Sequence, residues 1–440
     1  MVTMPHWPLP PWSRFEKNNL ENFQKLMHFF ENPEDKLPPI IHVAGTNGKG
    51  SSVAFVKAIF EEAGYCVQTY TSPHLIEFNE RIYCNKNFIS DEDVYIFAEK
   101  VRLVCEKMDL KLTFFEAITA MAFLYFASKK SDILLLEVGI GGKLDVTNVI
   151  KNPLVSLITP ISYDHMEFLG DTLPLIASQK AGIIKYSCDS IISLQEEEVY
   201  EIFHQKASQM KSNCFFFSYD FGVIKSEEDD KIYYKDKDSE IFLENISLKG
   251  DHQYINASAV IAAIKLTKIQ QYFQITDEHI KKGLSSTYWL GRIDHVNKQR
   301  FPILQNITSE IWLDGAHNTG GALVLSNWVK ENIKGSLYLI IGMTKKKEIE
   351  SFVQYFVDIV DNFIAVAVHS EASSYSSEHV SKKISAISSK EVINFDSLDE
   401  AFDVITKMKK QPDNILISGS LFLISDFYKY VKTTEKKIQK

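Results

Sequence analysis

A glycine-rich turn stands between a short apolar run and a helical period near the start of the chain. Its residues are Gly45, Thr46, Asn47, Gly48, Lys49, Gly50 and Ser51. The apolar run at 40–44 predicts a strand, and residues 51–63 predict a helix. At such a junction glycines let backbone N–H groups converge on an anion, and the helix N-terminus adds its positive end. The turn therefore predicts a phosphate-binding loop within an α/β sheet of mostly parallel strands.

The turn departs from the common phosphate-loop pattern at two positions. Val43 stands where the first glycine would be, and Gly50 follows Lys49 where Ser or Thr normally binds Mg²⁺. Lys49 is predicted to reach the outer phosphates as a point charge. Ser51 is displaced by one position and would point differently, so a magnesium ligand must come from elsewhere. The alternative is a glycine turn that only caps the helix, but its place between strand and helix favours phosphate binding.

Three further side chains carry charge or metal-binding chemistry. Glu137 lies at the carboxyl end of the apolar strand predicted at 132–140, where ligands bind in open α/β sheets. A buried carboxylate needs a partner, and a metal-nucleotide would supply one; the alternative is a hydrogen bond to the following glycine turn. His165 follows the strand predicted at 155–161, and Lys180 lies in an amphipathic helix. Taken singly, these two indicate only a satisfied polar histidine and an exposed lysine.

The alternation of strands and helices restarts after about residue 295. The expected later strands are 311–316, 336–343, 363–368 and 414–419. Because 440 residues exceed one ordinary core, we predict two domains, 1–295 and 296–440. A charged, alternating stretch at 225–247 predicts an exposed hairpin, and a long helix is expected from 251 to about 271.

Composition excludes several classes of protein. The net charge of -9 argues against a nucleic-acid partner. The five cysteines are odd in number and lack a CxxC pair, which argues against a disulfide framework or zinc site and fits a reducing compartment. The first residues lack a basic region followed by an apolar run, and no stretch approaches the ~20 apolar residues of a membrane span. We therefore expect a cytoplasmic protein with no membrane partner.

An ordered set of motifs carries a family resemblance. They read HVAGTNGKGSS (42–52), TSPHLIEFNERI (71–82), FEAITAMAFLYF (115–126), LLEVGIGGKLDVTNVI (135–150), DH and LG (164–170), KAGIIK (180–185), GDHQYINA (250–257), GRIDHV (291–296), DGAHNTGG (314–321) and GSLFL (419–423). The chain resembles the folylpolyglutamate synthase/dihydrofolate synthase family, a branch of the Mur ligase superfamily, in its bacterial form. The resemblance implies a phosphate-loop ATPase domain of the Mur central type at 1–295. It also implies a smaller, Rossmann-like glutamate-ligase domain at 296–440.

The resemblance also implies the reaction. ATP phosphorylates a substrate carboxylate to an acyl phosphate, and the amine of L-glutamate displaces phosphate, so that ADP, phosphate and an amide are formed. The acceptor would be dihydropteroate, folate (poly)glutamates or both, within folate biosynthesis and one-carbon metabolism. Its cofactors would be ATP and two Mg²⁺ ions, and the family suggests a monomer.

Residue roles follow from the matching motifs. Lys49 would neutralise the β and γ phosphates. Ser72 and Glu137 would hold one Mg²⁺, His165 would serve a second, and Lys180 matches a lysine that carries a carbamate in this superfamily. The nucleotide would be contacted by residues 45–51 together with Asn256, Arg292, Asp314 and His317. The substrate-binding positions would be Ser72, Pro73, Phe78, Arg81 and Ser420.

This sequence departs from the family pattern at several positions, and two other functions compete. Gln179 precedes Lys180 where Glu is common, Leu290 replaces a proline, Phe422 replaces Tyr, and 345–347 is basic where an acidic run is frequent. A Mur-type ligase acting on a cell-wall muramyl peptide is one alternative, although the FNERI text favours folate. A non-catalytic nucleotide-binding switch is the other, but it would not need Glu137, His165 and Lys180 together.

Overall fold

The computed structural model describes residues 19–226 and 231–438, and the chain divides into two compact units. The first unit comprises residues up to 247 together with 253–288, and the second comprises 248–252 and the residues from 289 onward. This division lies slightly before the boundary predicted at 295. The segment after residue 288 joins the second unit because β12 (Asp294–His295) pairs antiparallel with β13 (Glu310–Leu313) of the second sheet. Each unit is described by itself.

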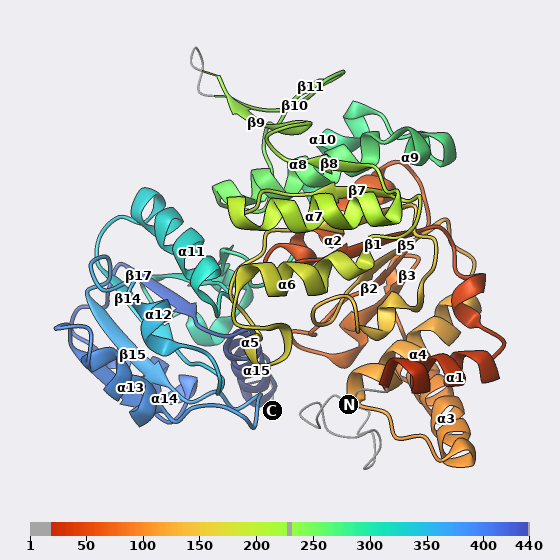
Figure 1. Cartoon of the computed structure of the whole chain (residues 1–440). Helices are drawn as coiled ribbons and strands as arrows, with labels where there is room; N and C mark the ends of the chain where they lie inside the picture. Colours follow the sequence, from red (N-terminus) through yellow and green to blue (C-terminus); the bar gives the residue numbers. More distant parts are fainter. Residues whose placement is uncertain (1–18, 227–230, 439–440) are drawn as a thin grey trace. The chain divides into compact units, whose positions relative to one another are not determined.

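An eight-stranded, mostly parallel sheet forms the centre of the first unit (Figure 1). Its order is β4-β3-β2-β5-β1-β6-β7-β8. The bounds are β1 (Ile40–Ala44), β2 (Val67–Tyr70), β3 (Ile82–Cys84), β4 (Asn87–Phe88), β5 (Ile133–Glu137), β6 (Val155–Ile158), β7 (Asp189–Ile192) and β8 (Cys214–Phe216). Within this sheet only β3 runs opposite to the other strands, so the β2–β3 and β3–β4 pairs are antiparallel. The central strands are buried along their length, as their continuous apolar runs predict.

Helices cover this sheet. The apolar core over β2 and β5 is shared with α1 (Asn19–Phe29), α3 (Asp91–Met108) and α4 (Phe114–Ala127). The core over β6 and β7 is shared with α6 (Leu173–Lys180) and α7 (Glu197–Met210). Helix α2 (Lys49–Glu62) packs against α10 (Asp277–Ser286). Thr113 and Glu116 form a reciprocal capping box at the start of α4.

The strand order places the glycine-rich turn at a topological switch point. From β1 the chain passes through α2 to β2 on one side, whereas from β6 it passes through α6 to β7 on the other side. Because β1 and β6 are neighbours, their two connections leave in opposite directions and open a crevice at the carboxyl ends of the strands. Ligands in open α/β sheets bind at this place.

Two local predictions changed in the structure. The predicted exposed hairpin is part of a three-stranded antiparallel sheet of β9 (Phe221–Lys225), β10 (Ile232–Asp236) and β11 (Glu240–Phe242). The long helix from Asp251 breaks at Leu266, whose extended ψ of 135° separates α8 (Asp251–Lys265) from α9 (Thr267–Tyr272). Helical periodicity alone does not reveal such a break, since both segments keep their apolar faces buried.

The second unit is built on a six-stranded sheet of order β12-β13-β17-β14-β15-β16 (Figure 1). Its remaining strands are β14 (Leu337–Ile341), β15 (Asn362–Val366), β16 (Val392–Phe395) and β17 (Asn414–Ser418), all parallel to β13. The helices are α11 (Thr319–Asn332), α12 (Ile349–Val353), α13 (Ser377–Ser385), α14 (Leu398–Lys407) and α15 (Leu421–Ile438). The last strand, β17, returns between β13 and β14, as in a doubly wound fold. Within residues 19–226 and 231–438, no helix has the length and apolarity of a membrane span.

Candidate active site

Two glycines of the turn sit where no other residue fits. Gly45 and Gly48 have φ values of +146° and +88°, and Gly48 caps the N-terminus of α2. A Cβ on Gly45 would overlap the Thr159 side chain, and a Cβ on Gly48 would overlap the Asn256 amide. The turn is therefore pressed between the end of β6 and helix α8. This places Asn256, a predicted nucleotide contact, directly against the loop.

The main chain of the turn is tied to the segment that follows β6. The Thr46 and Asn47 N–H groups both donate to the Pro160 carbonyl, at 3.0 and 3.2 Å. An anion would therefore be bound by the first turn of α2, whose initial N–H groups have no acceptor within the helix. The Ser51 hydroxyl is buried and accepts from the Gln253 amide at 3.4 Å. The Ser51 side chain is therefore directed toward Gln253 of α8.

Two lysines converge on one carbonyl at this loop. The Lys49 ammonium donates to the Gly45 and Thr46 carbonyls at 3.0 and 3.2 Å, and the Lys180 ammonium donates to the same Gly45 carbonyl at 2.8 Å. Lys180 ends α6 and is only 4% exposed, so the structure excludes the alternative of an exposed lysine. Burial, and then the charge of Lys49, lower the pKa of Lys180 well below its ordinary value. Lys180 therefore favours its neutral form.

A buried carboxylate lies beside the residue after β2. Glu137 ends β5, is 3% exposed, and accepts from the Ser72 N–H at 3.0 Å through Oε2. The two residues meet because β2 and β5 are parallel neighbours whose carboxyl ends share one edge. The peptide bond from Ser72 to Pro73 is cis. Ser72 and Glu137, predicted as magnesium ligands from separate motifs, are thus adjacent.

The glycine turn after Glu137 is held by Asp145, which the sequence reasoning missed. Asp145 Oδ2 accepts from the Gly139 and Ile140 N–H groups at 3.0 and 3.1 Å. Burial raises the pKa of Asp145. The same turn is also hydrogen-bonded to α6, because the Lys143 N–H donates to the Gln179 carbonyl at 2.7 Å. Asp145 therefore helps to place the end of α6, which carries Lys180. The sequence LDVTN after the glycines contains Asp145, and it was the feature of the chain that could have indicated this role.

A buried polar chain links this carboxylate to the centre of the sheet. The Thr147 hydroxyl donates to Asp145 Oδ1 at 2.5 Å and lies 3.0 Å from His42 Nε2. Because that hydroxyl proton is committed to the carboxylate, His42 donates through Nε2 to the threonine oxygen. Burial lowers the pKa of His42 to about 3, so its ring is neutral at physiological pH.

His165 begins the short helix α5 (Met166–Leu169) after β6. Its N–H donates to Asp164 Oδ1 at 2.9 Å, and its Nε2 lies 3.8 Å from Asp164 Oδ2. The negative charge of Asp164 also acts to raise the pKa of Lys180. Within the described ranges, no three His, Cys, Asp or Glu side chains gather as a metal cluster. Mg²⁺ commonly uses one or two carboxylates together with phosphate oxygens and water. Glu137 with Ser72 fits that pattern.

The predicted substrate residues of the first unit share one loop. It joins β2 to β3 and contains Pro73 and the 3-10 helix Phe78–Arg81. The Phe78 ring packs edge-on against Phe114, at 6.2 Å between centroids. Arg81 is buried and donates through Nε to His74 Nδ1 at 2.8 Å. Burial lowers the pKa of Arg81, and the negative charge of Glu137 acts to raise it. A cation and an aromatic ring therefore belong to the same loop as Ser72.

The second unit carries its own group of predicted residues at the carboxyl ends of β13 and β17. Asp314 is buried and accepts from the Ile293 and Ala316 N–H groups at 2.9 and 2.8 Å. Burial raises the pKa of Asp314, while the charge of Arg292 acts to lower it. His317 Nδ1 lies 2.9 Å from the Gly315 carbonyl. Ser420 follows β17, and its hydroxyl accepts from the Phe422 N–H at 3.1 Å. Arg292, Asp314 and His317 thus belong to one local network.

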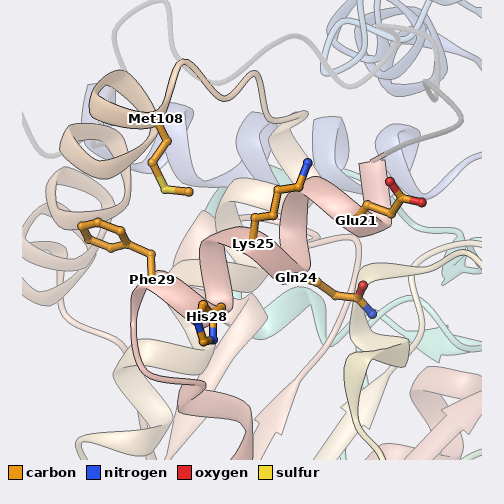
Figure 2. A pocket seen from close by; sticks show the side chains of 6 residues that line it. All are labelled: Glu21, Gln24, Lys25, His28, Phe29 and Met108. Carbon is orange, nitrogen blue, oxygen red and sulfur yellow. The ribbon is translucent and has the colours of Figure 1, made fainter.

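A surface hollow of about 560 Å³ lies elsewhere in the first unit. Figure 2 shows its lining, which is Glu21, Gln24, Lys25, His28 and Phe29 of α1 together with Met108 at the end of α3. None of the predicted site residues lines it. We therefore place the chemistry at the phosphate loop, where charged groups converge, and not at this hollow.

Comparison with known proteins shows that two protein-family models match this chain. Residues 43–264 match the Mur ligase middle domain, and residues 297–430 match the C-terminal domain of dihydrofolate synthetase. The dihydrofolate synthase/folylpolyglutamate synthase of Bacillus subtilis (strain 168) is 34% identical over 429 residues, covering 94% of this chain and 95% of that protein.

Two solved structures share the fold. The folylpolyglutamate synthase of Mycobacterium tuberculosis, complexed with ADP and AMPPCP, has a TM-score of 0.83 at 23% identity, covering 94% of this chain and 95% of that chain. The bifunctional folylpolyglutamate synthase/dihydrofolate synthase of Yersinia pestis, complexed with AMPPNP and a Mn ion, has a TM-score of 0.82 at 22% identity, covering 96% and 95%. The α/β fold predicted for both parts of the chain is therefore confirmed.

Proposed function

The chain belongs to the folylpolyglutamate synthase/dihydrofolate synthase family, and from this premise we propose that it is an ATP-dependent ligase. It joins L-glutamate to dihydropteroate, to folate (poly)glutamates or to both. The observation that carries the proposal is the convergence of Lys49 and Lys180 on the Gly45 carbonyl at a topological switch point. The Lys49 cation suits an anionic nucleotide, and a structural turn would require neither Lys49 nor the buried Lys180 beside it.

The reaction has two steps. A carboxylate oxygen of the acceptor attacks the γ-phosphorus of ATP, the bond to the β-phosphate oxygen breaks, and an acyl phosphate forms. The amine of glutamate then attacks the acyl carbon and phosphate leaves, so that an amide results. Such transfers depend on positioning and charge neutralisation, and Lys49 supplies positive charge where the transferred group becomes negative. When bound, Mg²⁺ would neutralise phosphate charge, held by Glu137 and Ser72, with His165 serving a second ion.

The remaining residue roles are part of the same proposal. Residues 45–51 and Asn256 contact the nucleotide, and Asn256 already lies against Gly48. Pro73, Phe78 and Arg81 face the folate acceptor. In the second unit, Arg292, Asp314 and His317 contact nucleotide, and Ser420 contacts the incoming glutamate; their grouping at the carboxyl ends of β13 and β17 supports this. We also propose a cytoplasmic monomer, in keeping with five free cysteines and a net charge of -9.

A parallel assay tests the proposed function. Purified protein with ATP, Mg²⁺ and L-glutamate is given dihydropteroate, tetrahydrofolate or a muramyl peptide, and ADP release and product mass are measured for each. We expect ADP release with one or both pterin acceptors and a product heavier by one glutamyl residue. Turnover only with the muramyl peptide would favour the Mur-type alternative, and nucleotide binding without ADP release would favour a switch.

We further propose that Lys180 carries a carbamate. Its neutral amine attacks the carbon of CO₂, an N–C bond forms, and one amine proton leaves to water, so the neutral side chain becomes an anion. The buried position and lowered pKa of Lys180 support this step, because only the uncharged amine is nucleophilic. Such an anion would explain how a lysine can stand beside metal ions.

Replacing Lys180 by alanine is expected to abolish most turnover, and added acetate should restore a measurable part of it. The small carboxylate would occupy the place of the missing carbamate. The Lys49→Ala variant is the matched control, since acetate cannot replace a cation there. Activity of Lys180→Ala that needs no added carboxylate would contradict the carbamate.

A further inference from the structure

The position of the phosphate loop depends on hydrogen bonds to a neighbouring segment, which must itself be held in place. This segment, residues 159–162, supplies the Pro160 carbonyl that accepts from the Thr46 and Asn47 N–H groups. It also supplies Ser162, whose carbonyl accepts from the Thr46 hydroxyl at 3.1 Å and whose own hydroxyl accepts from the Asn47 amide at 3.0 Å. Any movement of this segment therefore moves the loop that holds Lys49.

Gln195 bridges the two residues that flank Pro160. Its Oε1 accepts from the Ile161 N–H at 3.1 Å, and its Nε2 donates to the Thr159 carbonyl at 3.2 Å. Gln195 lies between β7 and α7 and is only 8% exposed. Proline has no N–H, so Pro160 cannot be anchored by a donor of its own and relies on its neighbours. We propose that Gln195 is a positioning residue for the nucleotide, acting through Pro160 on the phosphate loop.

The chemistry of the side chain explains why an amide stands here. The bridge needs an acceptor for Ile161 and a donor for Thr159 at once, which one carboxamide provides. If the bridge were removed, the buried Thr159 carbonyl would lose its hydrogen bond from Gln195. An unsatisfied buried acceptor lowers the free energy of unfolding. A displacement of ~1 Å at a reacting group can cost roughly 10²-fold in rate. The inference rests on the proposed use of ATP by this chain.

The test compares Gln195→Met with a matched variant, Gln68→Met. Gln68 is also buried in the first unit and donates to the Phe126 carbonyl at 3.2 Å, but its partners lie on α4 and β3. Binding of AMPPNP with Mg²⁺ is measured by calorimetry, Tm by thermal unfolding, and KM for ATP and for glutamate by ADP release. For Gln195→Met we expect Kd for AMPPNP and KM for ATP to rise about tenfold or more, with KM for glutamate within about twofold.

Gln68→Met should lower Tm by a similar amount, since each variant loses two hydrogen bonds of a buried amide, one of them to a main-chain carbonyl. It should leave Kd for AMPPNP within about twofold of the wild type. If Gln195→Met keeps wild-type AMPPNP affinity, or if both variants weaken it equally, the positioning role is overturned. A wild-type chain that binds no AMPPNP would overturn the proposed function, and this inference with it.

A second variant covers the case in which Gln195→Met does not fold. Gln195→Glu keeps the acceptor for Ile161 but can donate to the Thr159 carbonyl only when its carboxyl group is protonated. Burial raises the pKa of such a group, so AMPPNP affinity of Gln195→Glu should improve as pH falls, relative to the wild type at each pH. A pH profile parallel to that of the wild type would contradict the bridge.

Discussion

Replacing Lys49 by alanine is expected to reduce ADP release by about 10³-fold or more at saturating substrates. The structure places the Lys49 ammonium over the loop carbonyls of Gly45 and Thr46, at the mouth of the first turn of α2. In phosphoryl transfer most of the acceleration comes from positioned charge, so alanine removes a principal contribution of this chain. Steady-state kinetics with ATP, Mg²⁺, glutamate and the accepted pterin measure the loss.

Lys57→Ala provides a matched control on the same helix. The Lys57 ammonium lies 3.8 Å from the centre of the Tyr83 ring, away from the loop. Its removal takes the same charge from α2, so turnover should stay within about twofold if the effect at Lys49 is local. A Lys49→Ala enzyme that kept a tenth of wild-type turnover would contradict the assignment of this lysine to the phosphates.

Replacing Glu137 by alanine is expected to abolish turnover to a similar degree, about 10³-fold. Glu137 is the buried carboxylate next to Ser72 at the shared edge of β2 and β5. The variant should bind AMPPNP without magnesium as the wild type does and should lose the gain in affinity that magnesium provides. Calorimetry with and without Mg²⁺, together with ADP release, separates these effects.

Two further substitutions refine this result. Glu137→Gln keeps an acceptor for the Ser72 N–H and removes only the negative charge, so it should lose nearly as much turnover as alanine. Asp132→Asn, an exposed carboxylate just before the same strand that accepts from the Cys66 N–H, should leave turnover unchanged. Full activity of Glu137→Gln would assign Glu137 to the Ser72 hydrogen bond and not to a metal.

Local features were predictable because they depend on residues near one another in the chain. The strand at Ile40–Ala44 was found as predicted, since an apolar run acts over a few residues. The strand β16 was not predicted, and its residues are mostly only half-buried, so it lacks a strong apolar run. The break at Leu266 was missed because the helical period continues on both sides.

The site residues also fall into two groups, those that the sequence alone indicates and those that only the folded structure reveals. Its glycine turn, Lys49, and the order of motifs that marks the family can all be read in the chain, because each is a contiguous stretch of residues. The roles of Asp145 and Gln195 cannot, because each depends on which distant main-chain groups lie within hydrogen-bond distance. Asp145 and Gln195 have no distinctive local pattern, so only the folded contacts reveal them.

The amino-acid sequence by itself determined the types of element, the phosphate loop between its strand and helix, and the identity of the charged groups. Only the tertiary structure decided that Lys180 meets the Gly45 carbonyl across 135 residues and that Glu137 meets Ser72 across 65. The physical reason is that element type follows from local backbone and side-chain preferences. Contacts between distant segments follow instead from strand order and register, which form only when the whole sheet and its covering helices pack together.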